Sequence, residues 1–161
     1  MPNAKVRLLS LDDTLRIGQA LGESIQPGTV IVLSGDLGAG KTQLASAIAQ
    51  GMGISETITS PTFAILKNYT SGRIPLNHMD IYRLETVEQL DDLDFWDLFS
   101  SDEPSATLIE WGGMFDEVSN KADLIISLSI VDDERRCMNL QAQSAQGEET
   151  LSLIVKVSSE N

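Results

Sequence analysis

The feature that most constrains this chain is the stretch GDLGAGKT at residues 35–42. It matches the phosphate-loop pattern G-x-x-x-x-G-K-[ST] in full, through Gly35, Gly40, Lys41 and Thr42. The β-branched run TVIVLS precedes it, and an alanine-rich segment whose apolar residues recur every four positions follows it. A strand, a glycine loop and a helix in this order form the context that the pattern requires. The sequence therefore predicts an α/β domain of the P-loop NTPase type.

Each residue type in the loop has a chemical reason. Gly35 lets the chain leave the strand sharply, while Gly38 and Gly40 permit positive φ and bring backbone N–H groups against phosphate oxygens. Lys41 supplies a point charge for the β- and γ-phosphates, and Thr42 supplies a hydroxyl for Mg²⁺. The helix that starts here adds unsatisfied N–H groups and a positive dipole end. We expect a nucleoside triphosphate to lie along the whole loop, namely Asp36, Leu37, Gly38, Ala39, Gly40, Lys41 and Thr42.

Two carboxylates stand at the predicted ends of two other strands. A Mg²⁺–triphosphate site needs further oxygen ligands, usually a carboxylate at a strand end. Asp80 closes IPLNHMD and Glu110 closes ATLIE, so both lie on the edge of the glycine loop if these strands run parallel to the first. At least one of them is expected to be a ligand of the Mg²⁺–triphosphate site, and Glu110 has the cleaner buried-strand context. The single histidine, His78, cannot build a zinc site and is expected to order the Asp80 turn.

Two further residues carry open alternatives. Thr62, after Pro61, is placed to sense the γ-phosphate from a closing loop, or else belongs to a rigid Ser-Pro turn. Trp111 follows Glu110 and is interpreted either as a core residue, which we favour, or as a lid on the site.

The remaining pattern predicts one domain over residues 1–161, because the chain is too short for two domains of roughly 100–150 residues each. Ser10 and Asp13 stand at capping-box spacing before a helix with apolar residues at every fourth position. Strands are predicted at 4–9, 106–110, 123–131, 136–142 and 150–157. A hairpin is predicted from 62–70 and 74–79, joined by three residues. An acidic helix is predicted at 86–99, with an apolar side of Leu90, Leu93, Trp96 and Phe99. The expected fold is a mixed, mostly parallel central sheet with flanking helices and a β-rich C-terminal part.

The charge of the chain limits its partners. With 24 Asp and Glu against 11 Lys and Arg residues, the formal net charge is −13, which disfavours direct binding to DNA, to tRNA or to anionic membranes. The sequence lacks a secretory signal and never reaches the ~20 apolar residues of a membrane span. Its lone cysteine, Cys137, excludes an internal disulfide. These observations predict a cytoplasmic protein.

Four blocks together resemble the TsaE family of bacterial ATPases: GDLGAGKT, SPTF, HMDIYRL at 78–84 and LIEW at 108–111. They keep their order and spacing over nearly the whole chain. The resemblance implies ATP and Mg²⁺ as cofactors and the TsaB and TsaD proteins as partners. Those partners transfer a threonylcarbamoyl group to tRNA, so tRNA would be met only indirectly, through the complex.

The resemblance also implies roles for individual residues. Gly38 to Thr42 hold the triphosphate, Thr42 and Glu110 bind Mg²⁺, and Asp80 lies at the metal or γ-phosphate side with Trp111 beside it. Lys41, Asp80 and Glu110 are the implied catalytic set, and a nucleotide contact is expected around Leu11. Many relatives have proline after the Glu-Trp pair, whereas this chain has Gly112-Gly113.

Two other functions fit a phosphate loop. A small-molecule kinase needs lid arginines, for which the chain offers only Arg83 and the pair 135–136. A nucleotide-binding interaction module would bind without turnover. A GTPase is disfavoured because the N-K-x-D pattern that reads guanine is absent.

Overall fold

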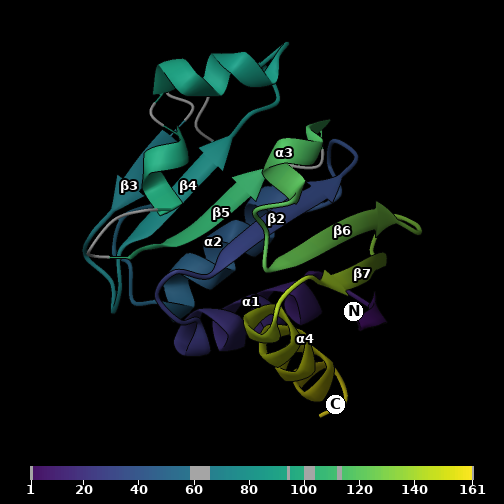
Figure 1. Ribbon diagram of the computed structural model, residues 1–161. Coiled ribbons are helices and arrows are strands. Elements are labelled where there is room, and N and C mark those ends of the chain that lie inside the picture. The colour runs from purple at the N-terminus through teal and green to yellow at the C-terminus, as the bar shows by residue number, and fades with distance from the viewer. Residues whose placement is uncertain (1, 59–65, 94, 100–103, 112–113, 161) are drawn as a thin grey trace.

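The computed structural model describes residues 2–58, 66–93, 95–99, 104–111 and 114–160 (Figure 1). Its strands are β1 (Asn3–Leu8), β2 (Val30–Gly35), β3 (Leu66–Tyr69), β4 (Leu76–Asp80), β5 (Ala106–Glu110), β6 (Leu124–Ile130) and β7 (Arg136–Ala142). Its helices are α1 (Leu11–Ser24), α2 (Lys41–Gly51), α3 (Asp116–Ser119) and α4 (Ala145–Ser158), with 3-10 helices η1 (Val87–Leu93) and η2 (Phe95–Phe99).

The strands form one sheet in the order β1-β7-β6-β2-β5-β4-β3. The four central strands β6, β2, β5 and β4 are parallel, whereas β7, β1 and β3 join antiparallel at the two sides. The predicted mixed α/β fold is confirmed, with parallel pairing confined to the centre. As predicted, β2 is central and β1 lies at an edge.

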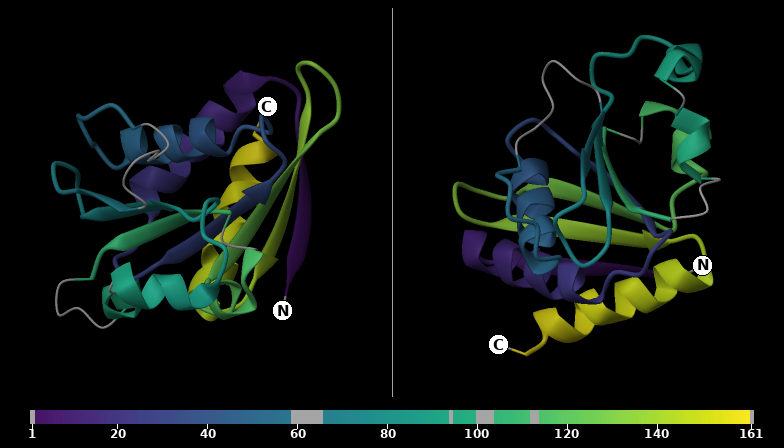
Figure 2. Two further views of the ribbon diagram at one scale, coloured as in Figure 1. Left: turned by 90° about the horizontal axis from the view of Figure 1, so that it is seen from above. Right: turned by 90° about the vertical axis from the view of Figure 1, so that its left-hand side faces the viewer.

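Apolar side chains of β2 alternate between two buried clusters. Ile31 and Leu33 pack with α1, α2 and α4 on one face, while Val30 and Val32 pack with η1, η2 and α3 on the other. The two layers are visible on either side of the sheet in Figures 1 and 2. A strand covered on both faces is buried throughout, which explains its continuous β-branched sequence. Among the described residues, no helix has the length and apolarity needed to cross a bilayer.

The prediction of a last strand at 150–157 is wrong, because this segment belongs to α4. Leu151 and Ile154, three residues apart, are buried, whereas Val155 is exposed, which is the period of a helix. The Ser144 hydroxyl accepts a hydrogen bond from the N–H of Gly147 at 3.0 Å and caps the helix. The C-terminal part is therefore two strands followed by a helix that packs on α1.

The hairpin connection is six residues long, 70–75, rather than three, since Tyr69 pairs with Leu76. The longer loop reaches the ends of α1 and α2: the N–H of Arg73 donates to the carbonyl of Met52 at 2.7 Å, and its guanidinium donates to the carbonyl of Gly22 at 2.8 Å. Part of the predicted first strand, 62–65, lies outside the described residues.

The segment predicted as one acidic helix at 86–99 is helical but consists of η1 and η2. Its most deeply buried aromatic residue is Phe95, which the predicted apolar side omits. The Phe95 ring meets the rings of Trp96 at 4.7 Å and Phe99 at 5.1 Å, both edge-on. Of the predicted apolar side, Leu90 is buried in the same cluster, and Trp96 and Phe99 pack against it. The three-residue spacing of the predicted side is that of a 3-10 helix, which has about three residues per turn.

The expected capping box at the start of α1 does not form. The Asp13 carboxylate accepts from the N–H of Leu9 at 2.8 Å and from the Arg16 guanidinium at 3.2 Å. The Ser10 side chain makes no capping hydrogen bond.

Candidate functional site

The candidate site lies at the carboxyl edge of the parallel strands. Asp80 at the end of β4 pairs with Glu110 at the end of β5, and Glu110 in turn pairs with Leu33 of β2. The glycine loop follows β2 directly. Because the three strands are parallel, both carboxylates come to the same edge as the loop, as the sequence predicted.

The loop has a backbone shape that only glycine adopts easily. Gly35, Gly38 and Gly40 have φ of 136°, 82° and 108°. A Cβ added at Gly35 would lie 2.2 Å from the carbonyl oxygen of Leu128, so a side chain has no room beside β6. At Gly38 a Cβ would meet no atom within 4 Å, so the loop is open on its outer side. A concave, open turn of this kind can present N–H groups to an anion.

Lys41 is buried at the centre of this turn, with 5% of its surface exposed. Its ammonium donates to the carbonyls of Gly35 at 2.6 Å and Asp36 at 3.0 Å. Burial lowers the pKa of Lys41, against the opposing effect of the nearby carboxylates, of which Glu110 contributes most. The loop thus holds a desolvated positive charge among its own carbonyl groups.

The Trp111 ring covers this charge. The Lys41 ammonium lies 4.0 Å from the centre of the ring, a cation–π distance. Trp111 also contacts the ring of Tyr82 at 4.8 Å and packs against the second core cluster. Its φ of 65° places a bulky residue in the left-handed region, which costs about 1–3 kcal/mol. Trp111 therefore packs against the second buried cluster, as favoured from the sequence, and also contacts the Lys41 ammonium.

Glu110 joins the loop to the sheet through both of its oxygens. Thr42 donates from Oγ1 to Glu110 Oε1 at 3.1 Å, and His78 Nε2 lies 2.6 Å from Glu110 Oε2. The expectation that His78 orders the Asp80 turn is wrong. The side chains of His78 and Asp80 share a face of β4 because they are two residues apart. Glu110 lies opposite Asp80 on β5, so His78 contacts it diagonally across the two strands. Asp80 instead accepts from the N–H of Tyr82 at 3.0 Å.

The chemistry of these donors suits a hard cation that brings its own ligands. Among the described residues, no group of three or more His, Cys, Asp or Glu side chains could hold a metal ion alone. Thr42 Oγ1 and Glu110 Oε1 are neutral and anionic oxygen donors side by side. Mg²⁺ prefers such oxygens, retains several waters and takes substrate phosphates as ligands. The residues therefore fit Mg²⁺ that arrives with a phosphate group.

A pocket of about 500 Å³ lies beside the glycine loop, and Leu11, a predicted contact, lines it with 54% of its surface exposed. Its walls come from three regions of the chain: the start of α1, the loop and the β6–β7 turn. They comprise Ser10, Leu11, Asp12, Thr14, Gly38, Ala39, Gly40, Gln43, Asp133, Glu134 and Arg136. Sequence reasoning missed Asp133 and Glu134. The sequence marks them only as polar residues of a turn between two strands, and a turn pattern does not predict a ligand contact.

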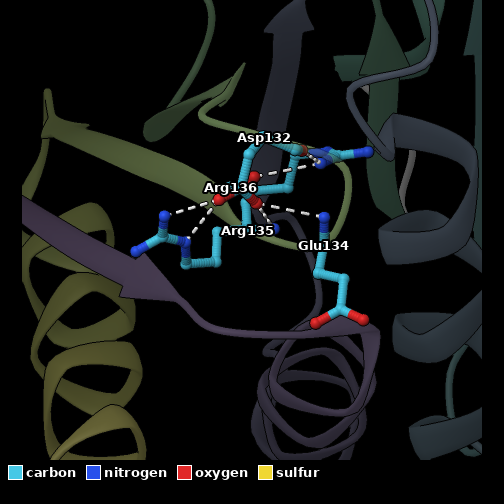
Figure 3. A network of polar contacts seen from close by, with 4 residues as sticks. All are labelled: Asp132, Glu134, Arg135 and Arg136. Carbon is cyan, nitrogen blue, oxygen red and sulfur yellow. Dashed lines mark hydrogen bonds and ion pairs between the residues drawn. The ribbon is translucent and has the colours of Figure 1, made fainter.

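The β6–β7 turn is held by a network around Asp132 (Figure 3). One carboxylate oxygen accepts from the N–H groups of Glu134 at 3.1 Å and Arg135 at 2.8 Å, and the other accepts from the Arg135 side chain at 2.7 Å. Arg136 donates to the backbone carbonyl of Asp132 at 2.6 Å. The hydrogen bond from the Arg135 side chain lowers the pKa of Asp132 to about 2. The turn that walls the pocket is therefore fixed by its own residues.

The other predicted site residues are Asp36, Leu37 and Thr62, and their positions differ. The Asp36 carbonyl accepts from the N–H of Ala39 at 3.0 Å and closes the loop. Leu37 is 86% exposed, so only its backbone can contribute to the turn. Thr62 lies outside the described residues.

Comparison with known proteins gives consistent matches. The family model for the threonylcarbamoyl adenosine biosynthesis protein TsaE matches residues 8–138. The chain is 35% identical to the tRNA threonylcarbamoyladenosine biosynthesis protein TsaE of Bacillus subtilis over 136 residues, which cover 84% of each chain. It is 40% identical to the TsaE protein of Treponema pallidum over 130 residues, covering 79% of this chain and 92% of that relative.

Two further similarities differ in their coverage. The match to the TsaE protein of Nostoc sp. is 51% identical over 86 residues and spans about half of each chain, 53% in both cases. The crystal structure of YdiB from Bacillus subtilis superposes with a TM-score of 0.72 at 27% sequence identity, covering 96% of this chain and 95% of that one.

Proposed function

The chain belongs to the TsaE family, and from this premise we propose that it is a Mg²⁺-dependent ATPase that supports threonylcarbamoyladenosine modification of tRNA. One observation carries the nucleotide part of the proposal. The buried ammonium of Lys41 and the 3.1 Å contact between Thr42 and Glu110 lie together at a turn of positive-φ glycines. A cation, a hydroxyl and a carboxylate around such a turn are the parts that a Mg²⁺-triphosphate requires.

Each residue has a defined task in this proposal. The amides of Asp36 to Thr42 cradle the phosphates, and Lys41 exchanges its bonds to the Gly35 and Asp36 carbonyls for phosphate oxygens. Thr42 and Glu110 hold Mg²⁺, which neutralises charge on the β- and γ-phosphates. Asp80 lies at the metal or γ-phosphate side. Lys41, Asp80 and Glu110 form the proposed catalytic set.

The nucleoside end of ATP is assigned to the pocket beside the loop. The pocket shares Gly38, Ala39 and Gly40 with the phosphate cradle, so a nucleotide can extend from one into the other. Its volume of about 500 Å³ is within the range of small-ligand sites. Leu11 and Thr14 at the start of α1 supply apolar and hydroxyl contacts.

We further propose that TsaB and TsaD are the partners through which the chain acts, with tRNA bound by them in the cytoplasm. A net charge of −13 opposes direct contact with an RNA backbone. It does not oppose contact with proteins, where charge sets orientation and partner choice. The single domain would then contribute ATP turnover, and the partners would contribute the chemistry on tRNA.

Steady-state ATP hydrolysis with and without the TsaB–TsaD complex tests this function. We expect turnover that depends on Mg²⁺ and increases with the partners, and loss of turnover in Lys41→Ala with the far-ultraviolet circular dichroism spectrum unchanged. Phosphate transferred to a small acceptor would favour the kinase alternative. Nucleotide binding without hydrolysis, even with partners present, would favour the interaction module. Full turnover by folded Lys41→Ala would refute the assignment of the loop.

A further inference from the structure

His78 is the only histidine of the chain, and it is completely buried behind Glu110. The 2.6 Å distance from its Nε2 to Glu110 Oε2 joins two side chains that are 0% and 2% exposed. Its other ring nitrogen, Nδ1, has no hydrogen-bond partner among the described residues. With Glu110 ionised, Nε2 is the donor of this contact, because an ionised carboxylate only accepts hydrogen bonds.

Fold stability does not account for such a pair. Taking a carboxylate and an imidazole out of water carries a desolvation penalty, and apolar residues of similar size often serve the fold equally well. The surroundings on their face of the sheet are apolar: Leu108, opposite His78 on β5, and Leu33, opposite Glu110 on β2, are fully buried. A polar pair at the end of these strands therefore calls for a role in the site that the strands present.

We propose that His78 is a positioning residue that fixes the Glu110 carboxylate for Mg²⁺. By holding Oε2, it leaves Oε1 facing the Thr42 hydroxyl, 3.1 Å away. Mg²⁺ demands near-ideal octahedral geometry, so a carboxylate presented through one fixed oxygen suits it better than one that rotates. This inference rests on the proposed function, because it assigns a role in the same nucleotide site.

Lys41 gives the fixed orientation a further consequence. Glu110 is the carboxylate that acts most strongly on the charge of the Lys41 ammonium. Without the bond from His78, the Glu110 carboxylate is free to turn toward that ammonium, and its Oε2 loses its only hydrogen-bond partner among the described residues. Both effects withdraw Oε1 from the place beside Thr42. Groups that orient a metal ligand in this way typically change metal affinity about 10- to 100-fold.

Two substitutions separate the hydrogen bond from the volume of the ring. In His78→Leu the donor is removed and the size approximately kept, whereas in His78→Gln an amide N–H can replace Nε2–H. Asn77→Val is the matched control, because Asn77 is buried next to His78 on β4 but bonds to Asn68 at 2.7 Å, outside the site. Urea denaturation of all three variants verifies that each is folded under the conditions of the binding assay.

Binding of fluorescently labelled ADP is then measured in EDTA and across a Mg²⁺ titration. We expect His78→Leu to keep the affinity measured in EDTA and to need about 10- to 100-fold more Mg²⁺ for half-maximal tightening. His78→Gln should restore most of the Mg²⁺ response, and Asn77→Val should match the wild type. A folded His78→Leu with the wild-type Mg²⁺ response, or an equal loss in EDTA and in Mg²⁺, overturns the inference.

The imidazole itself gives a second readout that needs no nucleotide. Because the chain has one histidine, its ring signals in ¹⁵N-correlated NMR spectra belong to His78 alone. We expect a proton on Nε2 that is protected from exchange and whose signal shifts in Glu110→Gln. A ring signal identical in the wild type and Glu110→Gln contradicts the contact.

If the wild type binds no nucleotide in either condition, the proposed function fails as well. If it binds with a Mg²⁺ response that His78→Leu retains, only the inference about His78 fails.

Discussion

Lys41 shows how a single residue can prepare a site at the expense of its own solvation. Its ammonium is buried, bonded to two loop carbonyls and covered by Trp111. These contacts replace water only in part, which is why burial dominates and lowers the pKa of the lysine. A triphosphate offers stronger acceptors for the same charge, so the lysine favours binding of an anion.

This lysine should leave a signature in the pH dependence of stability. Its folded-state pKa lies below the ordinary lysine value of 10.5, so between these two values the unfolded state binds more protons and stability rises with pH. We therefore expect the free energy of unfolding of the wild type, minus that of Lys41→Met, to increase from neutral pH toward about pH 10. Urea denaturation at several pH values measures it. The same difference for Lys67→Met, at an exposed lysine, is the control, and a flat Lys41 difference would contradict the lowered pKa.

The position of a single site residue can be predicted from the sequence when it belongs to a local backbone motif. A contact between residues far apart in the sequence cannot be predicted in this way. The loop residues, Asp80 and Glu110 follow from the pattern and from the ends of parallel strands. The partner of His78 depends on a diagonal contact between β4 and β5, which requires the register of two distant segments. Glu134 reaches the pocket through the β6–β7 turn, and no local pattern links that turn to the loop.

Among the elements, the two long terminal helices offer a matched comparison of caps. Ser144 precedes α4 and accepts from the N–H of Gly147, whereas Ser10 precedes α1 without a side-chain capping bond. Ser144→Ala should therefore lower the free energy of unfolding by about 1 kcal/mol, because it removes the cap and also the hydrogen bond from the Ser144 hydroxyl to the Asp123 carboxylate at 2.7 Å. Ser10→Ala should lower it by clearly less. Chemical denaturation of both variants measures which loss is larger. Equal losses would show that the capping hydrogen bond of Ser144 adds no stability beyond that of the uncapped Ser10.

The misassigned α4 shows why elements are harder to predict than motifs. Its sequence LSLIVKV alternates apolar and polar residues in part, and a short apolar run has no unique period. The burial of Leu151 and Ile154 follows from the partner surface of α1, which the sequence of α4 does not contain. By contrast, β2 and α2 flank a loop that admits only one order of elements, so both were predicted correctly.

Over the whole molecule, the predicted class of fold is confirmed because it follows from one strand-loop-helix unit and the strands around it. The crossover order that places β5 between β2 and β4 could not be read from the chain. That order nevertheless sets the site, since it makes Glu110 the direct neighbour of both β2 and Asp80. Local patterns thus define the parts, and the sheet order defines which parts meet.

The acidic walls of the pocket have a consequence for how fast an anionic nucleotide can arrive. Asp12, Asp133 and Glu134 face it against the single guanidinium of Arg136, within a chain whose net charge is −13. Long-range repulsion of this kind weakens as the screening length falls from about 30 Å at 0.01 M salt to about 8 Å at 0.15 M. We expect the association rate constant of fluorescently labelled ADP, followed by stopped-flow fluorescence of the label, to rise with ionic strength, and less so in Asp133→Asn/Glu134→Gln. A rate that falls with added salt would mean that the nucleotide approaches through an attractive field. If the rate rises as expected, ionic strength acts as an accelerator for this protein, the reverse of its effect on a basic phosphate-binding surface.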